Sequence, residues 1–189
     1  ADCKTRSAQG VQYDANYFQH VLTRASTSNG VCGMKLSTAA LELMRSGLGA
    51  IFDWLRPKYI WLRRRDVLRQ AISLYRAKAT DHWRWPVGEP RPATCPRFDE
   101  ERIQQCRREI TAANEQWETW FAEHDVRPLE LWYEDLLRAP QVCIQTVCRF
   151  VGVDKEELPS ASSGLQVMRD DVTEEWARRI QEDEGVVAN

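Results

Sequence analysis

Three consecutive arginines follow a short apolar run, and they are the residues of this chain best suited to binding chemistry. Residues 59–62 read YIWL, and Arg63, Arg64 and Arg65 come next, directly before a stretch with helical periodicity. Arginines crowded at the start of a helix oppose the helix dipole, which favours anions there. A fold tolerates the crowding more readily when an anion binds between the guanidinium groups. The spacing therefore indicates a local anion site.

Ser73 is the second candidate, because it lies eight residues beyond Arg65 and about two turns into the expected helix. In open α/β sheets, ligands bind outside the carboxyl ends of the strands. An arginine at a strand end and a serine hydroxyl on the following helix can converge on one phosphate. The alternative is a solvated basic surface with an ordinary helical serine, and the spacing alone favours that alternative.

The elements that must position these residues alternate between strands and helices. This order predicts an α/β domain with a mostly parallel sheet flanked by helices, and residues 1–189 show no domain boundary. Strands are expected at 31–36, at 59–62 (buried on both faces) and at 128–133. Helices are expected at 11–28, 38–46 (capped by Ser37 and ended by the glycines at 47 and 49), 67–81 (with Leu68, Ala71, Ile72 and Tyr75 facing inward), from Asp99 to His124, 141–151 and around Trp176. A proline-rich loop is expected at 83–98, and a turn is expected after YEDL at Ala139 and Pro140.

Composition excludes several classes of protein. The chain has 189 residues and a net charge of −2 despite 26 basic side chains, so it lacks the overall positive field of a nucleic-acid binder. No run approaches the ~18 apolar residues of a membrane span. The six cysteines contain no C-x-x-C pair, and Cys106, Cys143 and Cys148 fit helical core positions. We therefore expect reduced thiols, no metal site and a cytoplasmic location.

The stretch RDVLRQAIS, residues 65–73, resembles the 3′-phosphate motif of sulfotransferases that use 3′-phosphoadenosine 5′-phosphosulfate (PAPS). The longer string YIWLRRRDVLRQAISLYRAKATDHW resembles the bacterial trehalose 2-sulfotransferase type in particular. Three further segments are similar to that branch in the same order: NGVCGMKL (29–36), YEDLLRAPQVCIQTVCRFVGV (133–153) and QVMRDDVTEEWARR (166–179).

This resemblance implies a P-loop-NTPase-like sulfotransferase fold and transfer of a sulfuryl group from PAPS to a hydroxyl, leaving 3′-phosphoadenosine 5′-phosphate (PAP). It implies a carbohydrate acceptor, such as trehalose or a glycolipid precursor, and it leaves a homodimer possible. Arg65 and Ser73 would bind the 3′-phosphate, and the Trp83 region would border the acceptor pocket. Residues 133–135 (Tyr-Glu-Asp) would be mainly structural, Arg169 is a further phosphate candidate, and Arg63 and Arg64 receive no role.

One family feature has no counterpart in this sequence. Sulfotransferases hold the 5′-phosphosulfate with an N-terminal strand–loop–helix, and the nearest string here, GVCGMKLS at 30–37, does not fit the G-x-x-x-x-G-K-[ST] pattern. The branch also takes its catalytic base from that N-terminal part. We therefore expect either that upstream residues complete the site or that the chain is a truncated homologue that binds nucleotide without catalysis. A P-loop kinase relative is a weaker alternative, because no Walker lysine is present.

Overall fold

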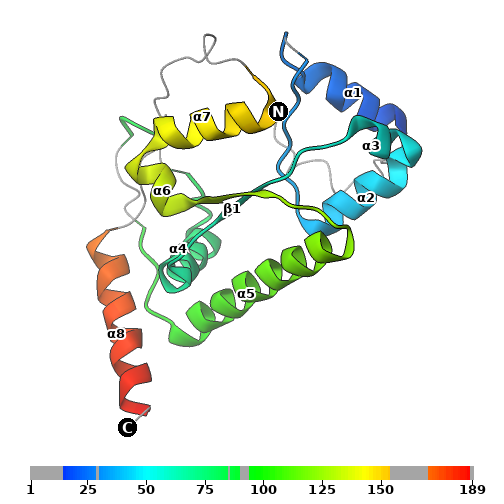
Figure 1. The fold of residues 1–189 in the computed structure, drawn as a ribbon. Helices are drawn as coiled ribbons and strands as arrows, with labels where there is room; N and C mark the ends of the chain where they lie inside the picture. The colour runs from blue at the N-terminus through cyan, green and yellow to red at the C-terminus, as the bar shows by residue number, and fades with distance from the viewer. Residues whose placement is uncertain (1–14, 29, 85, 90–93, 154–169, 188–189) are drawn as a thin grey trace. The chain divides into compact units, whose positions relative to one another are not determined.

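The computed structural model describes residues 15–28, 30–84, 86–89, 94–153 and 170–187 (Figure 1). The chain divides into two compact units between Lys58 and Tyr59. The expectation of one sulfotransferase-like domain is not tested by this division and stays a prediction. None of the helices in the described ranges is long and apolar enough to cross a membrane.

The described residues of the first unit form three helices, α1 (Ala15–Ala25), α2 (Thr38–Leu48) and α3 (Ala50–Leu55). The predicted helix at 11–28 is confirmed over Ala15–Ala25, and residues 11–14 lie outside the described part. Ser37 caps α2 as predicted, because its hydroxyl accepts the Ala40 N–H at 3.2 Å. Only Gly49 ends this helix, with φ at +52°, since Gly47 lies inside it.

The predicted strand at 31–36 is wrong. Residues 31–36 contain a single antiparallel bridge, between Cys32 and Ser26, and no ladder. The Thr27 N–H donates to the Val31 carbonyl at 2.8 Å, and the Thr27 hydroxyl bonds the same carbonyl at 3.0 Å. These bonds close a tight turn, so the apolar run follows a turn and has no partner strand among the described residues.

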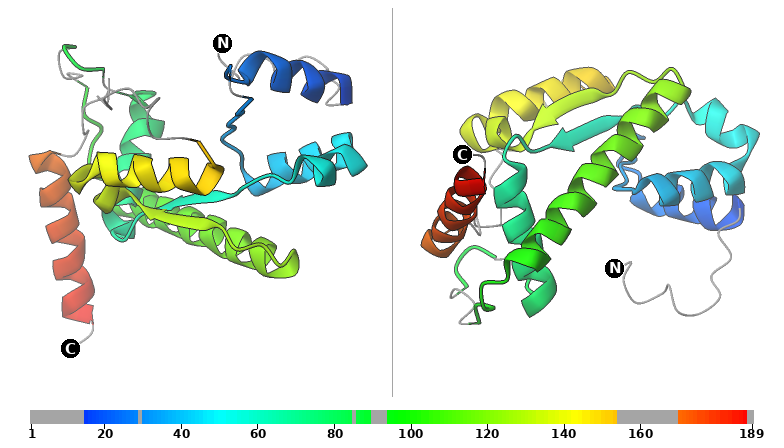
Figure 2. Two further views of the ribbon diagram at one scale, coloured as in Figure 1. Left: turned by 45° about the horizontal axis from the view of Figure 1, so that its top comes forward. Right: turned by 90° about the horizontal axis from the view of Figure 1, so that it is seen from below.

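The second unit contains two parallel strands, β1 (Ile60–Arg63) and β2 (Leu129–Trp132), in the register Ile60↔Leu129 to Arg63↔Trp132. The predicted strands at 59–62 and 128–133 are confirmed, and their parallel pairing agrees with the prediction of a mostly parallel sheet. Burial of β1 on both faces is wrong, because Trp61 is buried whereas Ile60 and Leu62 are 41% and 53% exposed. Figure 2 shows α5 (Glu100–Glu123) and α7 (Pro140–Val151) on opposite sides of the strands.

The remaining helices are α4 (Val67–Thr80), α6 (Tyr133–Arg138) and α8 (Asp171–Val187). Asp66 caps α4 by accepting the Arg69 N–H at 2.9 Å, and Asp99 caps α5 by accepting the Arg102 N–H at 3.1 Å. The helices predicted at 67–81, 99–124, 141–151 and around Trp176 are confirmed. The six-residue α6 was not predicted, because YEDLLR is too short to show a helical period before Pro140 begins α7.

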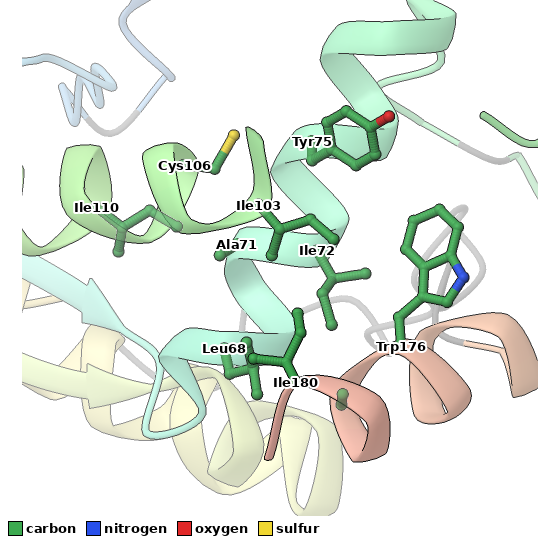
Figure 3. Packing of buried hydrophobic residues seen from close by; sticks show 10 residues of the cluster. Leu68, Ala71, Ile72, Tyr75, Ile103, Cys106, Ile110, Trp176 and Ile180 are labelled. Atoms are coloured by element: carbon green, nitrogen blue, oxygen red, sulfur yellow. The ribbon is translucent and has the colours of Figure 1, made fainter. Parts of the chain in front are cut away.

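The core of this unit lies where α4, α5 and α8 meet (Figure 3). Ile72, Ile103 and Ile180, one from each helix, are fully buried. The inward residues predicted for α4 are all in this core: Leu68, Ala71, Ile72 and Tyr75. Cys106, Cys143 and Cys148 are buried as predicted. At its far end α5 packs Phe121 against Trp61, with ring centroids 5.4 Å apart, and so covers one face of β1.

Candidate functional site

Two turns meet at the carboxyl edge of the sheet. One leads from β1 into α4 through residues 64–66 (Arg-Arg-Asp), and the other is the first turn of α6, residues 133–135 (Tyr-Glu-Asp), which follows β2 directly. The parallel register pairs Arg63 with Trp132, so the two turns leave the sheet side by side. This edge is where α/β sheets bind ligands.

Arg65 is held by Asp135 at this edge. Its Nη1 lies 2.9 Å from Oδ1 and its Nη2 2.7 Å from Oδ2, and its guanidinium lies 4.9 Å from the Trp132 ring centroid. The hydrogen bond raises the pKa of Arg65 above its usual value and holds the pKa of Asp135 below its own. The Arg65 side chain is 48% exposed, and its Nε–H meets no acceptor among the described residues.

Glu134 occupies the backbone donors at the start of α4. Its carboxylate accepts the Arg65 N–H at 3.2 Å to both oxygens and the Asp66 N–H at 3.5 Å. Partial burial raises the pKa of Glu134, but hydrogen bonds from its own N–H and those of Arg65 and Asp66 outweigh burial, so the pKa lies below its usual value. A protein carboxylate therefore already supplies the negative charge that this helix start favours.

Arg63 and Arg64 differ sharply in their surroundings. Arg63 pairs with Glu118 at 2.9 Å and Glu130 at 3.3 Å and lies over the Trp61 ring at 4.0 Å. Arg64 lies over the Tyr133 ring at 3.8 Å, and within the described ranges no carboxylate pairs with it. Arg63 and Arg65 both lie over the Trp132 ring, at 5.1 and 4.9 Å, whereas Arg64 lies over the neighbouring Tyr133 ring.

The two arginines farther along α4 are bound to α8. Arg69 bonds Glu174 at 2.6 Å and Asp66 at 2.8 Å. Arg76 forms a two-point pair with Asp170, at 2.6 and 2.9 Å. Within the described residues, four of the five arginines that cluster in 63–76 are thus neutralised by carboxylates, and Arg64 is the exception. The crowding of arginines is relieved mostly by the protein's own acids.

The three predicted site residues lie at different places along α4. Arg65 precedes the helix, and Ser73 lies near the end of its second turn, half-buried and between Arg69 and Arg76 on one face. The Ser73 hydroxyl makes no hydrogen bond within the described ranges. Trp83 follows the other end of α4, is 44% exposed and donates its indole N–H to Asp81 at 2.7 Å. The phosphate candidates and the acceptor candidate are thus separated along α4, which spans Val67–Thr80.

Arg64 was not assigned a role from the sequence, although it directly follows the strand end where α/β sheets bind ligands. What the local sequence cannot show is which arginines are neutralised, since Glu118, Glu130 and Asp135 come from distant segments.

A two-strand parallel edge lined by arginines, followed by a helix that carries an unbonded serine hydroxyl, fits a class of protein that binds phosphate or sulfate groups. The chain belongs to the Stf0 sulphotransferase family, whose model matches residues 1–183.

Two curated relatives are similar to this chain along most of its length. It is 30% identical over 179 residues to a trehalose 2-sulfotransferase of Mycobacterium tuberculosis (strain Erdman), which covers 86% of this chain. It is 31% identical over 180 residues to a trehalose 2-sulfotransferase of Mycolicibacterium smegmatis, which covers 87% of this chain. The matched region spans 65% and 66% of the length of these two relatives.

Proposed function

We propose that this chain acts as a PAPS-dependent sulfotransferase that moves a sulfuryl group to a hydroxyl of a carbohydrate. Its membership of the Stf0 sulphotransferase family supports this reaction over phosphoryl transfer from ATP. The names of its two relatives make trehalose the first acceptor to test. The parallel strands, each followed by a helix, are compatible with the P-loop-like sulfotransferase fold that we propose for it.

The observation that carries the proposal is Arg64 at the carboxyl edge of the sheet, which no carboxylate of the described residues neutralises. Its guanidinium is stacked on Tyr133 and keeps its N–H donors for a ligand. The Nε–H of the adjacent Arg65 and the Ser73 hydroxyl likewise make no hydrogen bond within the described part of the chain. We propose that these donors bind the 3′-phosphate of the nucleotide, Arg65 and Ser73 as the family motif implies and Arg64 as the cation that the structure adds.

When bound, PAPS supplies the sulfuryl group, and the chain's own residues position it and balance its charge. Charged hydrogen bonds from arginine to phosphate orient the nucleotide, and the Ser73 hydroxyl adds a neutral donor. The exposed face of Trp83, whose indole is anchored to Asp81, is suited to stacking on a sugar ring, so we keep it as a candidate border of the acceptor site. We assign the catalytic base to no residue of this chain.

The described cysteines suit a reducing compartment. Cys32, Cys95, Cys106, Cys143 and Cys148 form no disulfide with one another. We therefore propose a cytoplasmic location.

The proposed function is tested by calorimetry of the 189-residue chain with PAP, with 5′-AMP as the control ligand. We expect PAP to bind clearly more tightly, because 5′-AMP lacks the 3′-phosphate. Equal affinity for both nucleotides would refute a 3′-phosphate site at this edge. Incubation with PAPS and trehalose then separates an enzyme, which releases PAP and sulfated sugar, from a homologue that binds nucleotide without turnover.

A further inference from the structure

Residues 64–66 and residues 133–135 face each other at the carboxyl edge of the sheet. The Tyr133 ring lies under the Arg64 guanidinium, and the Asp135 carboxylate holds the Arg65 guanidinium. Glu134 accepts the backbone N–H groups of Arg65 and Asp66. Each side chain of the turn after β2 therefore holds the turn after β1, by a ring face, by side-chain hydrogen bonds or by backbone hydrogen bonds.

The way Asp135 holds Arg65 leaves part of the guanidinium available. A guanidinium offers two forks for an oxyanion, one formed by Nη1 and Nη2 and one formed by Nε and Nη2. Asp135 occupies the first fork, with one oxygen on each Nη. The Nε–H and the remaining Nη2–H stay directed away from Asp135. Asp135 therefore orients the Arg65 guanidinium, and the Nε–H and the second Nη2–H remain as donors for a second anion.

Glu134 acts on the same segment through the backbone. By bonding the Arg65 and Asp66 N–H groups it fixes the peptide units that follow Arg64, at the point where the extended strand ends and Asp66 begins to cap α4. The flexible side chain of Arg65 then runs between a backbone fixed by Glu134 and a guanidinium held by Asp135, and that of Arg64 runs between the same backbone and the Tyr133 ring. The two carboxylates thus reduce the conformational freedom that an anion would otherwise have to remove when it binds.

We propose that Glu134 and Asp135 are positioning residues for nucleotide binding: they orient Arg64 and Arg65 toward the 3′-phosphate without contacting the nucleotide. This inference rests on the proposed function, and it assigns these two acids a role in affinity rather than only in folding. The alternative hypothesis is that Asp135 competes with the phosphate for the Arg65 guanidinium. The two readings predict opposite changes in affinity when Asp135 loses its charge.

A double-mutant cycle on PAP affinity tests the proposal. We expect Asp135→Asn and Arg65→Ala each to weaken PAP binding about tenfold, the scale of one charged hydrogen bond. Because Asp135 acts through Arg65, the double variant should bind no more weakly than Arg65→Ala alone. Tighter binding by Asp135→Asn, or losses that multiply in the double variant, would overturn the proposal.

Glu130→Gln is the matched control for this cycle. Glu130 is a carboxylate within β2 that pairs with Arg63, and Arg63 keeps Glu118 as a second partner. Its substitution should leave PAP affinity unchanged within about twofold. Glu134→Gln is the second variant, and we expect it to weaken PAP binding several-fold because an amide is a poorer acceptor for two backbone N–H groups. Unchanged affinity in Glu134→Gln would remove Glu134 from the proposal.

Chemical modification of Arg65 in the absence of nucleotide tests whether Asp135 restrains the arginine, independently of PAP binding. It therefore distinguishes a failure of this inference from a failure of the proposed function. Phenylglyoxal adds to accessible guanidinium groups, and mass spectrometry of peptides reports its rate at Arg65. We expect faster modification in Asp135→Asn than in the parent chain, with the rate at Arg65 unchanged in Glu130→Gln. If the parent chain binds no PAP, the proposed function fails. An unchanged Arg65 rate in Asp135→Asn would show that Asp135 does not restrain the arginine.

Discussion

The guanidinium of Arg76 on α4 and the carboxylate of Asp170, directly before α8, form a two-point ion pair at 2.6 and 2.9 Å between residues 94 positions apart. Asp170 is nearly buried, with 8% of its side chain exposed, and it also accepts the N–H and the hydroxyl of Thr173, both at 2.9 Å. The Asp170 carboxylate therefore both caps α8 and attaches α8 to α4. Its partner on α4, Arg76, lies three residues beyond Ser73.

Asp170→Asn should destabilise the chain. The substitution leaves the Arg76 charge facing a neutral amide in a partly buried position, so we expect a loss of about 2–3 kcal/mol in the free energy of unfolding. Urea denaturation followed by circular dichroism measures it. Glu182→Gln is the control, because the Arg178–Glu182 pair is 65% and 60% exposed and should contribute less than about 0.5 kcal/mol. Equal losses in both variants would contradict this account.

The same ion pair predicts a dependence of stability on pH. Burial raises the pKa of Asp170, but hydrogen bonds from Arg76 and Thr173 outweigh burial and hold it at about 2, below the ordinary value of about 3.9. A depressed folded-state pKa contributes stability above the unfolded pKa, and that stability is lost as pH falls from about 4 to 2. The contribution is about 2.5 kcal/mol at neutral pH.

The difference in unfolding free energy between the parent chain and Asp170→Asn, measured from about pH 6 to about pH 2, isolates this contribution from the other carboxylates. We expect the difference to shrink steadily below about pH 4. A difference that stays constant across this range would mean that the stability of the parent chain does not depend on ionised Asp170.

The three consecutive arginines should differ in their effect on nucleotide affinity. We expect Arg64→Ala to weaken PAP binding by about 10- to 100-fold, because it removes the cation that no described carboxylate neutralises. Arg63→Ala is the matched control, since Arg63 is committed to Glu118 and Glu130 and should change PAP affinity little. Calorimetry of both variants checks this. A larger loss for Arg63→Ala would place the anion on the Trp61 face instead.

Ser73→Ala tests the family motif separately from the arginines. A neutral hydroxyl donor contributes about 0.5–1.5 kcal/mol, so PAP affinity should fall by about 2- to 10-fold while 5′-AMP affinity stays the same. Thr80 supplies the control on the same helix, because its hydroxyl is already bonded to the Arg76 carbonyl at 2.8 Å. Thr80→Val should leave PAP affinity unchanged in the same titration, and an equal loss in both variants would remove Ser73 from the site.

The core predicts a large stability effect at Ile72. Its side chain is fully buried between α5 and α8, so Ile72→Ala should cost about 2–5 kcal/mol through lost burial and the cavity that remains. Leu62→Ala is the comparison, since Leu62 is 53% exposed and should cost much less. Thermal denaturation of both variants measures the difference. Similar losses would show that the exposed face of β1 is buried in solution.

Local sequence determined most elements of the second unit. Apolar spacing located α4 and α5, and Asp99 marked the start of α5, because capping depends on residues only three positions apart. Periodicity also selected the inward residues of α4. The failed strand at 31–36 shows the limit of this reasoning, because a strand needs a partner and that stretch has none among the described residues.

The tertiary structure alone decided which charges at the site are neutralised. The sequence showed five arginines in residues 63–76, but not that Arg63, Arg65, Arg69 and Arg76 pair with acids while Arg64 stacks on Tyr133. Most of those acids lie 55 to 105 positions away along the chain, so no local pattern relates them to the arginines. Ion pairing depends on distance in space, and the parallel register of β1 and β2 and the packing of α8 on α4 set that distance.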